Sequence, residues 1–288
     1  MIGEDSMPIR KFQKLFRRCV LKTLTLGALA VLAPRSQAQS NEEFDSYKLR
    51  ISGFWVYSSP SGTLQGSSDN DQIDLEKDLG FSNYSTFAGK VDWKFTHKNH
   101  LYFVGAAFNS SRQTVLNRTI TFQGQTFQAG AVVQSSLDSP MYGVGYQYDI
   151  LRRRRGHLGI GAQVNFFDAH ASIRADAQVT GGGIHQAAAS ASASLLAPIP
   201  VAGPEARFYL TNSPRWFIEG NIYGMYFFGY GNFVSSAGSV GYTVNRHLSL
   251  NAGYQLGSRL VVNNDSSSDR IGLKLTQRGP VAGLEVSF

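Results

Sequence analysis

Apolar and polar residues alternate with a period of two over most of this chain, and that pattern limits the folds open to it. The clearest case is residues 248–260 (LSLNAGYQLGSRL), in which the even positions are almost all apolar and the odd positions are mostly polar or glycine. Successive side chains of a β-strand point to opposite faces, whereas a helical pattern repeats about every 3.6 residues. The sequence therefore predicts an all-β protein whose strands have one apolar and one polar face.

Two architectures produce such strands: a soluble sandwich that buries the apolar faces, and a membrane barrel that turns them toward lipid. Three features favour the barrel. The segments reach the roughly 9–11 residues needed to cross a bilayer at a tilt. Tyrosine and tryptophan lie near segment ends, and tight connections such as residues 151–156 alternate with long polar ones such as 59–82. We therefore predict a transmembrane antiparallel up-and-down β-barrel.

About ten strands fit between the turns. They are residues 46–58, 84–96, 100–122, 126–150, 157–179, 192–211, 215–230, 233–244, 247–262 and 270–288. The sixth and eighth are the weakest, the sixth because Pro198, Pro200 and Pro204 cannot donate hydrogen bonds to a neighbouring strand, and eight strands is the alternative. The third to sixth strands exceed the length of a membrane crossing, so residues 110–138 and 168–194 are expected to form extended hairpins beyond the membrane.

The first 38 residues predict a secretory signal peptide, and residues 39–288 the barrel. A basic region precedes an apolar run of 11 residues between Lys22 and Pro34, and a small-residue cleavage site ends at Ala38. Residues 1–38 hold seven of the 27 lysines and arginines and two of the 20 acidic residues, so the remainder is close to neutral. We therefore expect no nucleic-acid partner. The only cysteine, Cys19, also lies in this segment, so the mature chain has no disulfide or thiolate site.

The last ten residues, GPVAGLEVSF, end on an aromatic carboxyl terminus, with Leu284, Val286 and Phe288 on one face. This stretch resembles the closing strand of single-chain bacterial outer-membrane β-barrel proteins. The resemblance implies that these three residues form the signal read by the barrel-assembly machinery. It also implies a location in the cell outer membrane, contact with membrane lipid and lipopolysaccharide, and a monomer. Because the strand count is even, both termini are expected on the periplasmic side, where the short turns lie, and the long hairpins are then extracellular.

One feature of this terminal stretch breaks the alternation. Ile271, Leu273 and Leu275 are apolar at odd positions, whereas the final residues are apolar at even ones. A β-bulge inserts one residue and so reverses the facing of a strand. We therefore predict a bulge near Gly279–Pro280, with the preceding part rising above the membrane.

Charged side chains on the polar faces are expected to line the lumen. They are Lys48, Arg50, Lys90, Asp92, Lys94, Asp149, His157, Glu205, Arg207, Glu219 and Arg259. Both signs are interspersed, and barrels of about eight strands are filled by side chains, whereas open channels need 16 or more. The preferred interpretation is a structural or surface-binding protein whose lumen is largely filled by ion pairs. The alternative is a narrow, porin-like passive channel for small solutes or apolar molecules.

A register prediction follows from the turn at residues 151–156. It places Asp149 opposite His157 and Gly145 opposite Gly161, all facing inward. Glycines at these positions, with Gly143 and Gly159, would leave a thin-walled groove, which either receives long side chains from across the barrel or holds a small ligand.

The sequence contains no recognisable catalytic or metal-binding motif, so we expect no enzyme, no cofactor and no metal site. Asp168 near His170 is the only constellation of catalytic residue types, and it lacks the paired carboxylates of barrel proteases. The acidic stretch 69–78 lacks the glycine and spacing of a calcium loop. Asp71 or Ser68 is instead expected to cap a short helix ended by Gly80.

Overall fold

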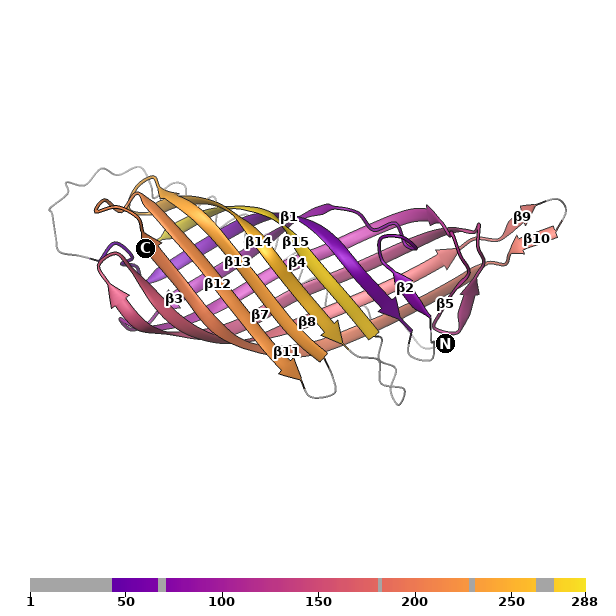
Figure 1. The fold of residues 1–288 in the computed structure, drawn as a ribbon, viewed down its shortest axis with the longest axis horizontal. Coiled ribbons are helices and arrows are strands. Elements are labelled where there is room, and N and C mark those ends of the chain that lie inside the picture. The colour runs from indigo at the N-terminus through magenta and orange to yellow at the C-terminus, as the bar shows by residue number, and fades with distance from the viewer. Residues whose placement is uncertain (1–42, 67–70, 181–182, 228–230, 263–271) are drawn as a thin grey trace, which may run out of the picture. The chain divides into compact units, whose positions relative to one another are not determined.

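The computed structural model describes residues 43–66, 71–180, 183–227, 231–262 and 272–288. The predicted signal peptide lies outside these residues. In the described part of the chain, ten long antiparallel strands form one sheet in which the last strand pairs with the first (Figure 1). They are β1 (Leu49–Gln65), β3 (Tyr84–Lys94), β4 (Asn99–Val115), β7 (Val132–Arg153), β8 (Gly156–Ala175), β11 (Ala189–Tyr209), β12 (Trp216–Phe227), β13 (Gly231–Thr243), β14 (Leu248–Val262) and β15 (Gly272–Ser287).

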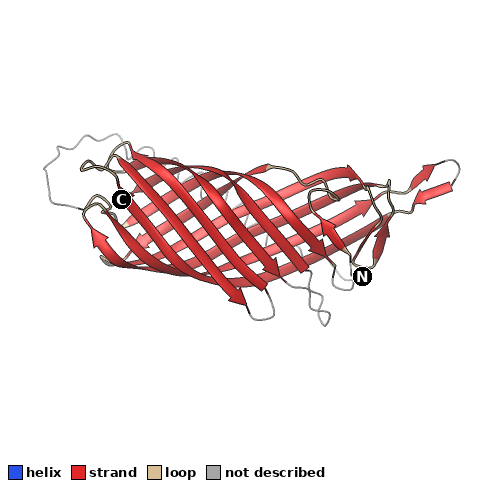
Figure 2. Cartoon of the chain, in the orientation of Figure 1, coloured by secondary structure: helices blue, strands red, loops and turns tan. Residues whose placement is uncertain are grey.

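The predicted all-β, ten-stranded, up-and-down barrel is therefore confirmed, and eight strands is wrong (Figure 2). The third and fourth strands are shorter than predicted. β4 ends at Val115 and β7 begins at Val132, and a separate hairpin lies between them, formed by β5 (Ile120–Phe122) and β6 (Gln125–Phe127). β2 (Gln72–Asp74) pairs beside the end of β1, and β9 (Gln178–Thr180) and β10 (Gly183–Gln186) form a second small hairpin. No helix in the described residues is long and apolar enough to cross a membrane.

The closing contact joins β1 to β15 without a register shift, from Arg50 opposite Ser287 to Gln65 opposite Gly272. At its end the Phe288 carbonyl accepts a hydrogen bond from the Lys48 amide at 2.6 Å, and the Phe288 amide donates to the Leu49 carbonyl at 2.8 Å. Closure pairs the backbone groups that would otherwise remain unsatisfied in hydrocarbon, where each costs several kcal/mol.

The proline-rich strand β11 is continuous despite its three prolines. It pairs with β8 from Ala189 to Phe208, but with β12 only at Ala202 and from Glu205 onward. Proline has no N–H to donate, so the ladder to one neighbour is interrupted. The ladder to β8 keeps the strand in the sheet.

The half of the barrel near the short turns carries its apolar side chains on the outside. On β7 the side chains of Tyr142, Tyr146, Tyr148 and Ile150 are exposed, whereas Gly143 and the other odd-numbered residues up to 149 are buried. Exposed residues of the same kind on other strands include Trp55, Phe87, Trp93, Phe103, Trp216, Ile218, Leu250, Tyr254 and Leu256. This apolar belt with aromatic side chains is the surface that a lipid-facing barrel requires.

The half near the long hairpins has the opposite arrangement. On β8, Ala169, Ala171 and Ile173 are buried inside, whereas His170 and Arg174 are exposed. The buried residues form one apolar cluster with side chains of the 71–81 segment and the β5–β6 hairpin, namely Ile73, Leu75, Leu79, Phe81, Ile120, Phe122 and Phe127. This half therefore resembles a soluble β-protein, with an apolar interior and a polar exterior.

The predicted bulge near Gly279–Pro280 on the last strand is wrong, and the inversion between the two halves explains the broken alternation instead. Leu273 and Leu275 are buried, Lys274 between them is exposed, and β15 keeps its register against β1 throughout. The strand does not change its facing. Instead, the apolar residues lie on the outer face in one half of the barrel and on the inner face in the other, as expected of a strand that passes from lipid into water. A register shift does occur at this level, but on β14, between Gln255 and Ser258.

Candidate functional site

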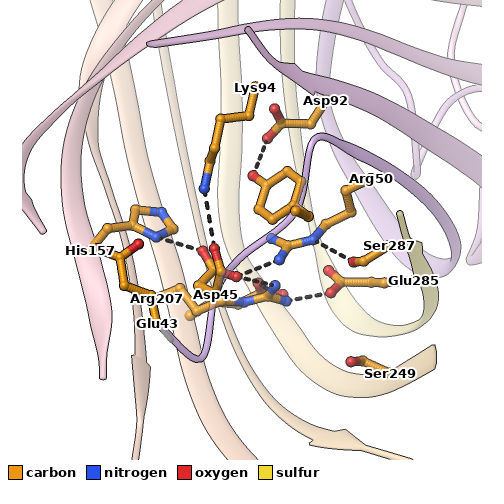
Figure 3. A network of polar contacts seen from close by, with 12 residues as sticks. Glu43, Asp45, Arg50, Asp92, Lys94, His157, Arg207, Ser249, Glu285 and Ser287 are labelled. Carbon is orange, nitrogen blue, oxygen red and sulfur yellow. Dashed lines mark hydrogen bonds and ion pairs between the residues drawn. The ribbon is translucent and has the colours of Figure 1, made fainter. Parts of the chain in front are cut away.

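The lumen at the short-turn end is occupied by the chain's own N-terminal segment, residues 43–47, which we term the plug (Figure 3). Asp45 is 3% exposed and Tyr47 7% exposed. The Phe44 ring packs edge-on against Tyr209, with centroids 5.6 Å apart, and the Phe44 amide donates to the Arg154 carbonyl at 2.9 Å. The segment before β1 thus folds back into the barrel.

Asp45 anchors the plug through both carboxylate oxygens. Its Oδ1 pairs with Arg50 and lies 3.6 Å from Nη1 of Arg207, and its Oδ2 lies 2.9 Å from Nδ1 of His157. The backbone carbonyl of Asp45 accepts hydrogen bonds from Lys94 at 3.2 Å and Arg152 at 3.1 Å. Lysine and arginine side chains from four strands therefore converge on one residue of the plug.

Arg207 connects this anchor to the closing strand. Its Nη2 contacts Glu219 at 2.9 Å and also pairs with Glu285 of β15. Asn251 donates to Glu219 at 3.0 Å and to Glu285 at 3.4 Å, so a neutral amide lies between the two acidic side chains. Three carboxylates surround one buried guanidinium, which offers five N–H donors in a planar fork.

A second chain of contacts runs from the plug across β3, β4 and β7. The Tyr47 hydroxyl donates to Asp92 at 3.0 Å, and His100 lies 3.1 Å from Asp92 through Nδ1 and 3.1 Å from Asp149 through Nε2. The His100 side chain is fully buried. Each of its ring nitrogens has a carboxylate partner.

The next layer toward the long hairpins is also filled. Lys90 pairs with Glu205 at 3.0 Å, and Tyr223 donates to the same carboxylate at 2.8 Å. Tyr102 lies over Gly145, where an added Cβ would be 2.3 Å from its ring, and the Tyr223 hydroxyl would be 2.6 Å from a Cβ on Gly161. The glycines face inward, and long side chains fill the groove that they leave.

All but two of the predicted lumen residues take part in these contacts. Lys48 is exposed and precedes β1. Arg259 is also exposed, whereas its neighbour Leu260 is buried. The prediction does not hold for Arg259 because the extra residue on β14 between Gln255 and Ser258 reverses the facing of everything beyond it.

The predicted register of β7 against β8 is wrong by two residues. Asp149 lies opposite Gly159, and His157 lies opposite Arg152. The turn contains only residues 154–155, and the register shifts between Asp149 and Leu151. A shorter turn with a bulge changes which residues face each other, while the glycines remain inside.

Sequence reasoning missed several residues of this network, namely Asp45, Tyr47, His100, Tyr102, Arg152, Tyr223 and Glu285. His100 is the first residue of the predicted third strand, and its position two residues before Tyr102 places both on the inner face of β4. Asp45 and Tyr47 precede the first strand, where alternation carries no signal.

At the long-hairpin end, an ion cluster holds the 71–81 segment against the β5–β6 hairpin. Arg118 contacts Asp71 at 2.7 Å and Asp78 at 2.7 Å, and the Thr121 amide donates to Asp71 at 3.0 Å. Partial burial raises the pKa of Asp71, but the hydrogen bonds from Arg118 and Thr121 outweigh it, so the pKa lies below its ordinary value. The predicted helix is absent: residues 75–79 form turns.

The turns of this segment are capped by a residue other than the two predicted. Asp74 accepts hydrogen bonds from the amides of Glu76 and Lys77, each at 2.9 Å. Ser68 lies outside the described residues.

The possible catalytic pair lies on the outer surface. His170 is half exposed, and its Nδ1 is 3.5 Å from Asp168 Oδ1. Asp138 is opposite His170 in the sheet. Within the described ranges, no group of three or more His, Cys, Asp or Glu side chains is arranged to hold a metal ion.

No protein-family model matches the sequence. No curated protein matches it either. Among solved structures, the chain is similar to the outer membrane protease OmpT from Escherichia coli, with a TM-score of 0.50, 12% identity, and coverage of 85% of this chain and 100% of that one.

Two other similar structures have lower scores. The attachment invasion locus protein Ail of Yersinia pestis has a TM-score of 0.36 and 10% identity, covering 84% of this chain and 99% of Ail. The toluene transporter TodX of P. putida has a TM-score of 0.35 and 9% identity, covering 85% of this chain and 91% of TodX. The closed barrel and the similarity to OmpT show that the chain has the fold of bacterial outer-membrane β-barrel proteins, as its terminal stretch predicted.

Proposed function

We propose that this protein is a non-conducting outer-membrane barrel with a structural or surface-binding role. The observation that carries the proposal is the plug: Asp45, 3% exposed, is held among cations of the barrel wall. Beyond it, the Lys90–Glu205 layer and the apolar cluster occupy the lumen in succession. A solute would have to displace all three.

The same proposal includes orientation and partners. The N-terminal plug and Phe288 lie at the short-turn end, and we place that end in the periplasm. The apolar belt contacts membrane lipid, and the polar half beyond it extends into the lipopolysaccharide layer. Leu284, Val286 and Phe288 are the residues that the assembly machinery would read. We propose a monomer with no nucleic-acid partner and no enzymatic activity.

Planar-bilayer recording of the purified, folded protein tests the closed lumen. We expect no discrete conductance steps from the full mature chain. A variant lacking residues 39–47 should also remain closed, because Tyr102, Tyr223 and the Lys90–Glu205 pair still fill the next layer. Steps in the full chain would contradict the proposal and support a narrow channel. Conductance steps seen only in the shortened variant would contradict the proposal that the layers beyond the plug close the lumen by themselves.

A hydrolase assay tests the proposed absence of catalysis. Incubation with lipid and peptide substrates should give no turnover. The control is His170→Ala, which removes the half-exposed imidazole without disturbing a buried contact. Hydrolysis that this substitution abolishes would overturn the non-enzymatic assignment.

A further inference from the structure

Three exposed cations lie close together on the outer face of β14 and β15. Arg259 lies on β14, opposite Thr276 of β15. Lys274 and Arg278 flank Thr276 at two residues on either side, and both are exposed. Diagonal neighbours in an antiparallel sheet are roughly 7–8 Å apart, within reach of long side chains. We term Arg259, Lys274 and Arg278 the basic triad.

Hydroxyl groups border the triad on the next strand. Ser59 of β1 lies opposite Arg278, and Ser61 lies opposite Thr276. Ser59 and Ser61 are exposed on the outer face. The patch thus offers hydrogen-bond donors from uncharged side chains beside three positive charges.

The residues that precede the triad and its neighbouring serines show at which level along the barrel axis the triad lies. On β1, Tyr57 and Trp55 precede Ser59 and are exposed at 38% and 41%. On β14, Tyr254 and Leu256 precede Arg259 and are exposed at 45% and 66%. The triad is therefore at the first polar level beyond the apolar belt, where the headgroups of a lipid leaflet lie.

The triad also differs from Arg118 and Arg174, two other cations in this half of the barrel. Arg118 has Asp71 at 2.7 Å, and Arg174 has Asp176 at 3.4 Å. Among the described residues, by contrast, no carboxylate forms an ion pair with any member of the triad. The wall formed by β7 and β8 instead carries Asp138 and Asp168 beyond its own aromatic residues. Of these two walls, the one formed by β14 and β15 therefore carries the cations that have no carboxylate partner among the described residues.

We infer that the basic triad binds the phosphate of an outer-leaflet lipid, whose acyl chains lie along the apolar belt beneath it. Guanidinium groups match phosphate oxygens with two parallel N–H donors, and a lysine adds a third, movable charge. The belt residues Tyr254 and Leu256 supply the apolar surface for the chains of the same molecule. The inference rests on the proposed placement in the membrane and specifies the lipid contact.

Lipid retention by the protein in nanodiscs tests the site, with bis-phosphorylated lipid A as the probe and phosphatidylcholine as the background. The test variant is Arg259→Gln/Lys274→Gln/Arg278→Gln, and the matched control is Arg174→Gln, an exposed cation on the opposite wall. Native mass spectrometry should show lipid A bound to the wild type and the control. Binding to the triple variant should be weaker by about tenfold or more, because the substitutions remove the charge-assisted hydrogen bonds to the phosphate oxygens. Millimolar inorganic phosphate should not displace the lipid.

Three outcomes would overturn the inference: equal retention by the triple variant, equal loss in Arg174→Gln, or full displacement by inorganic phosphate. The last result would assign the patch to free phosphate. Failure of the wild type to enter nanodiscs at all would instead overturn the proposed membrane function, so the two failures are distinguishable.

Discussion

Asp45→Asn tests how firmly the plug is held. The substitution preserves the shape of the side chain but removes its charge. It weakens contacts to Arg50, Arg207 and His157, all of which are largely buried. Arg207 retains Glu219 and Glu285, so it is not left without a counter-charge.

The expected loss follows from these remaining contacts. Breaking a buried ion pair by removing one partner costs about 3–5 kcal/mol. Because Arg207 keeps two carboxylates, we expect the low end of this range, about 3 kcal/mol. Asp176→Asn is the control: Asp176 and Arg174 are 84% and 70% exposed, and such a pair contributes about 0–1 kcal/mol.

Urea unfolding of the barrel in lipid vesicles measures both variants, with electrophoretic mobility separating folded from unfolded chains. The free energy of unfolding should fall by about 3 kcal/mol for Asp45→Asn and by less than about 1 kcal/mol for Asp176→Asn. Protease should also cleave residues 43–47 faster in the first variant. A loss for Asp45→Asn no larger than that of the control would refute the reasoning that buried charge pairs hold the plug.

Three further predictions concern the inner wall, the ion cluster and the outer wall. Gly145→Ala should destabilise the barrel by about 1–3 kcal/mol, because its Cβ would lie 2.3 Å from Tyr102, whereas Gly53→Ala meets nothing within 4 Å and should be neutral in the same unfolding assay. The pKa of Asp71 is lower in the folded protein than in the unfolded chain, where it is about 3.9. The ionised carboxylate therefore contributes its full stabilisation above the unfolded pKa, and this stabilisation is lost as the pH falls through the folded pKa. The protection of the Thr121 amide against hydrogen exchange, relative to an unstructured amide at the same pH, should fall there, and Arg118→Gln should reduce this dependence. Leu284→Arg on the lipid face should cost about 2–4 kcal/mol, whereas Ser61→Arg above the belt should change unfolding by less than about 0.5 kcal/mol.

Strand positions were predictable because alternation is a local property. On β7, tyrosines and valine alternate with glycines, and the structure turns the first set outward and the second inward. The same local pattern placed a turn between residues 122 and 126, where the structure has the turn of the β5–β6 hairpin, although this hairpin is separate from β4 and β7. Its turn residues Gln123 and Gly124 have φ of 52° and 74°. Two-residue hairpin turns favour such positive values.

The contents of the lumen were only partly predictable. The alternation of side chains along each strand placed Arg50, Lys90 and Arg207 inside. It could not indicate that Asp45 folds back between them, because residues before the first strand are not part of a strand pairing. Arg259 was misplaced because a one-residue bulge has no signal in a run of small residues such as 257–258. Register depends on turn length, which the four consecutive arginines at 152–155 did not specify.

The reversal of the alternation on the last strand was visible in the sequence, but the predicted bulge was the wrong explanation for it. Leu273 and Leu275 break the alternation of the terminal stretch, and a bulge is one of two explanations. The other is that a strand leaving the lipid reverses its apolar face without turning. Only the pairing of β15 with both neighbours distinguishes the two.

Spin labelling along β15 tests this reversal of sidedness most directly. Cys19 is the only cysteine and lies in the predicted signal peptide, so single cysteines can be introduced from residue 273 to 286 without background. Labels at 274 and 278 should be accessible to a water-soluble nickel reagent, and labels at 282, 284 and 286 to oxygen dissolved in lipid. Labels at 273 and 275 should be immobile and inaccessible to both. Oxygen accessibility at 274, or lipid exposure at 283 and 285, would contradict the account.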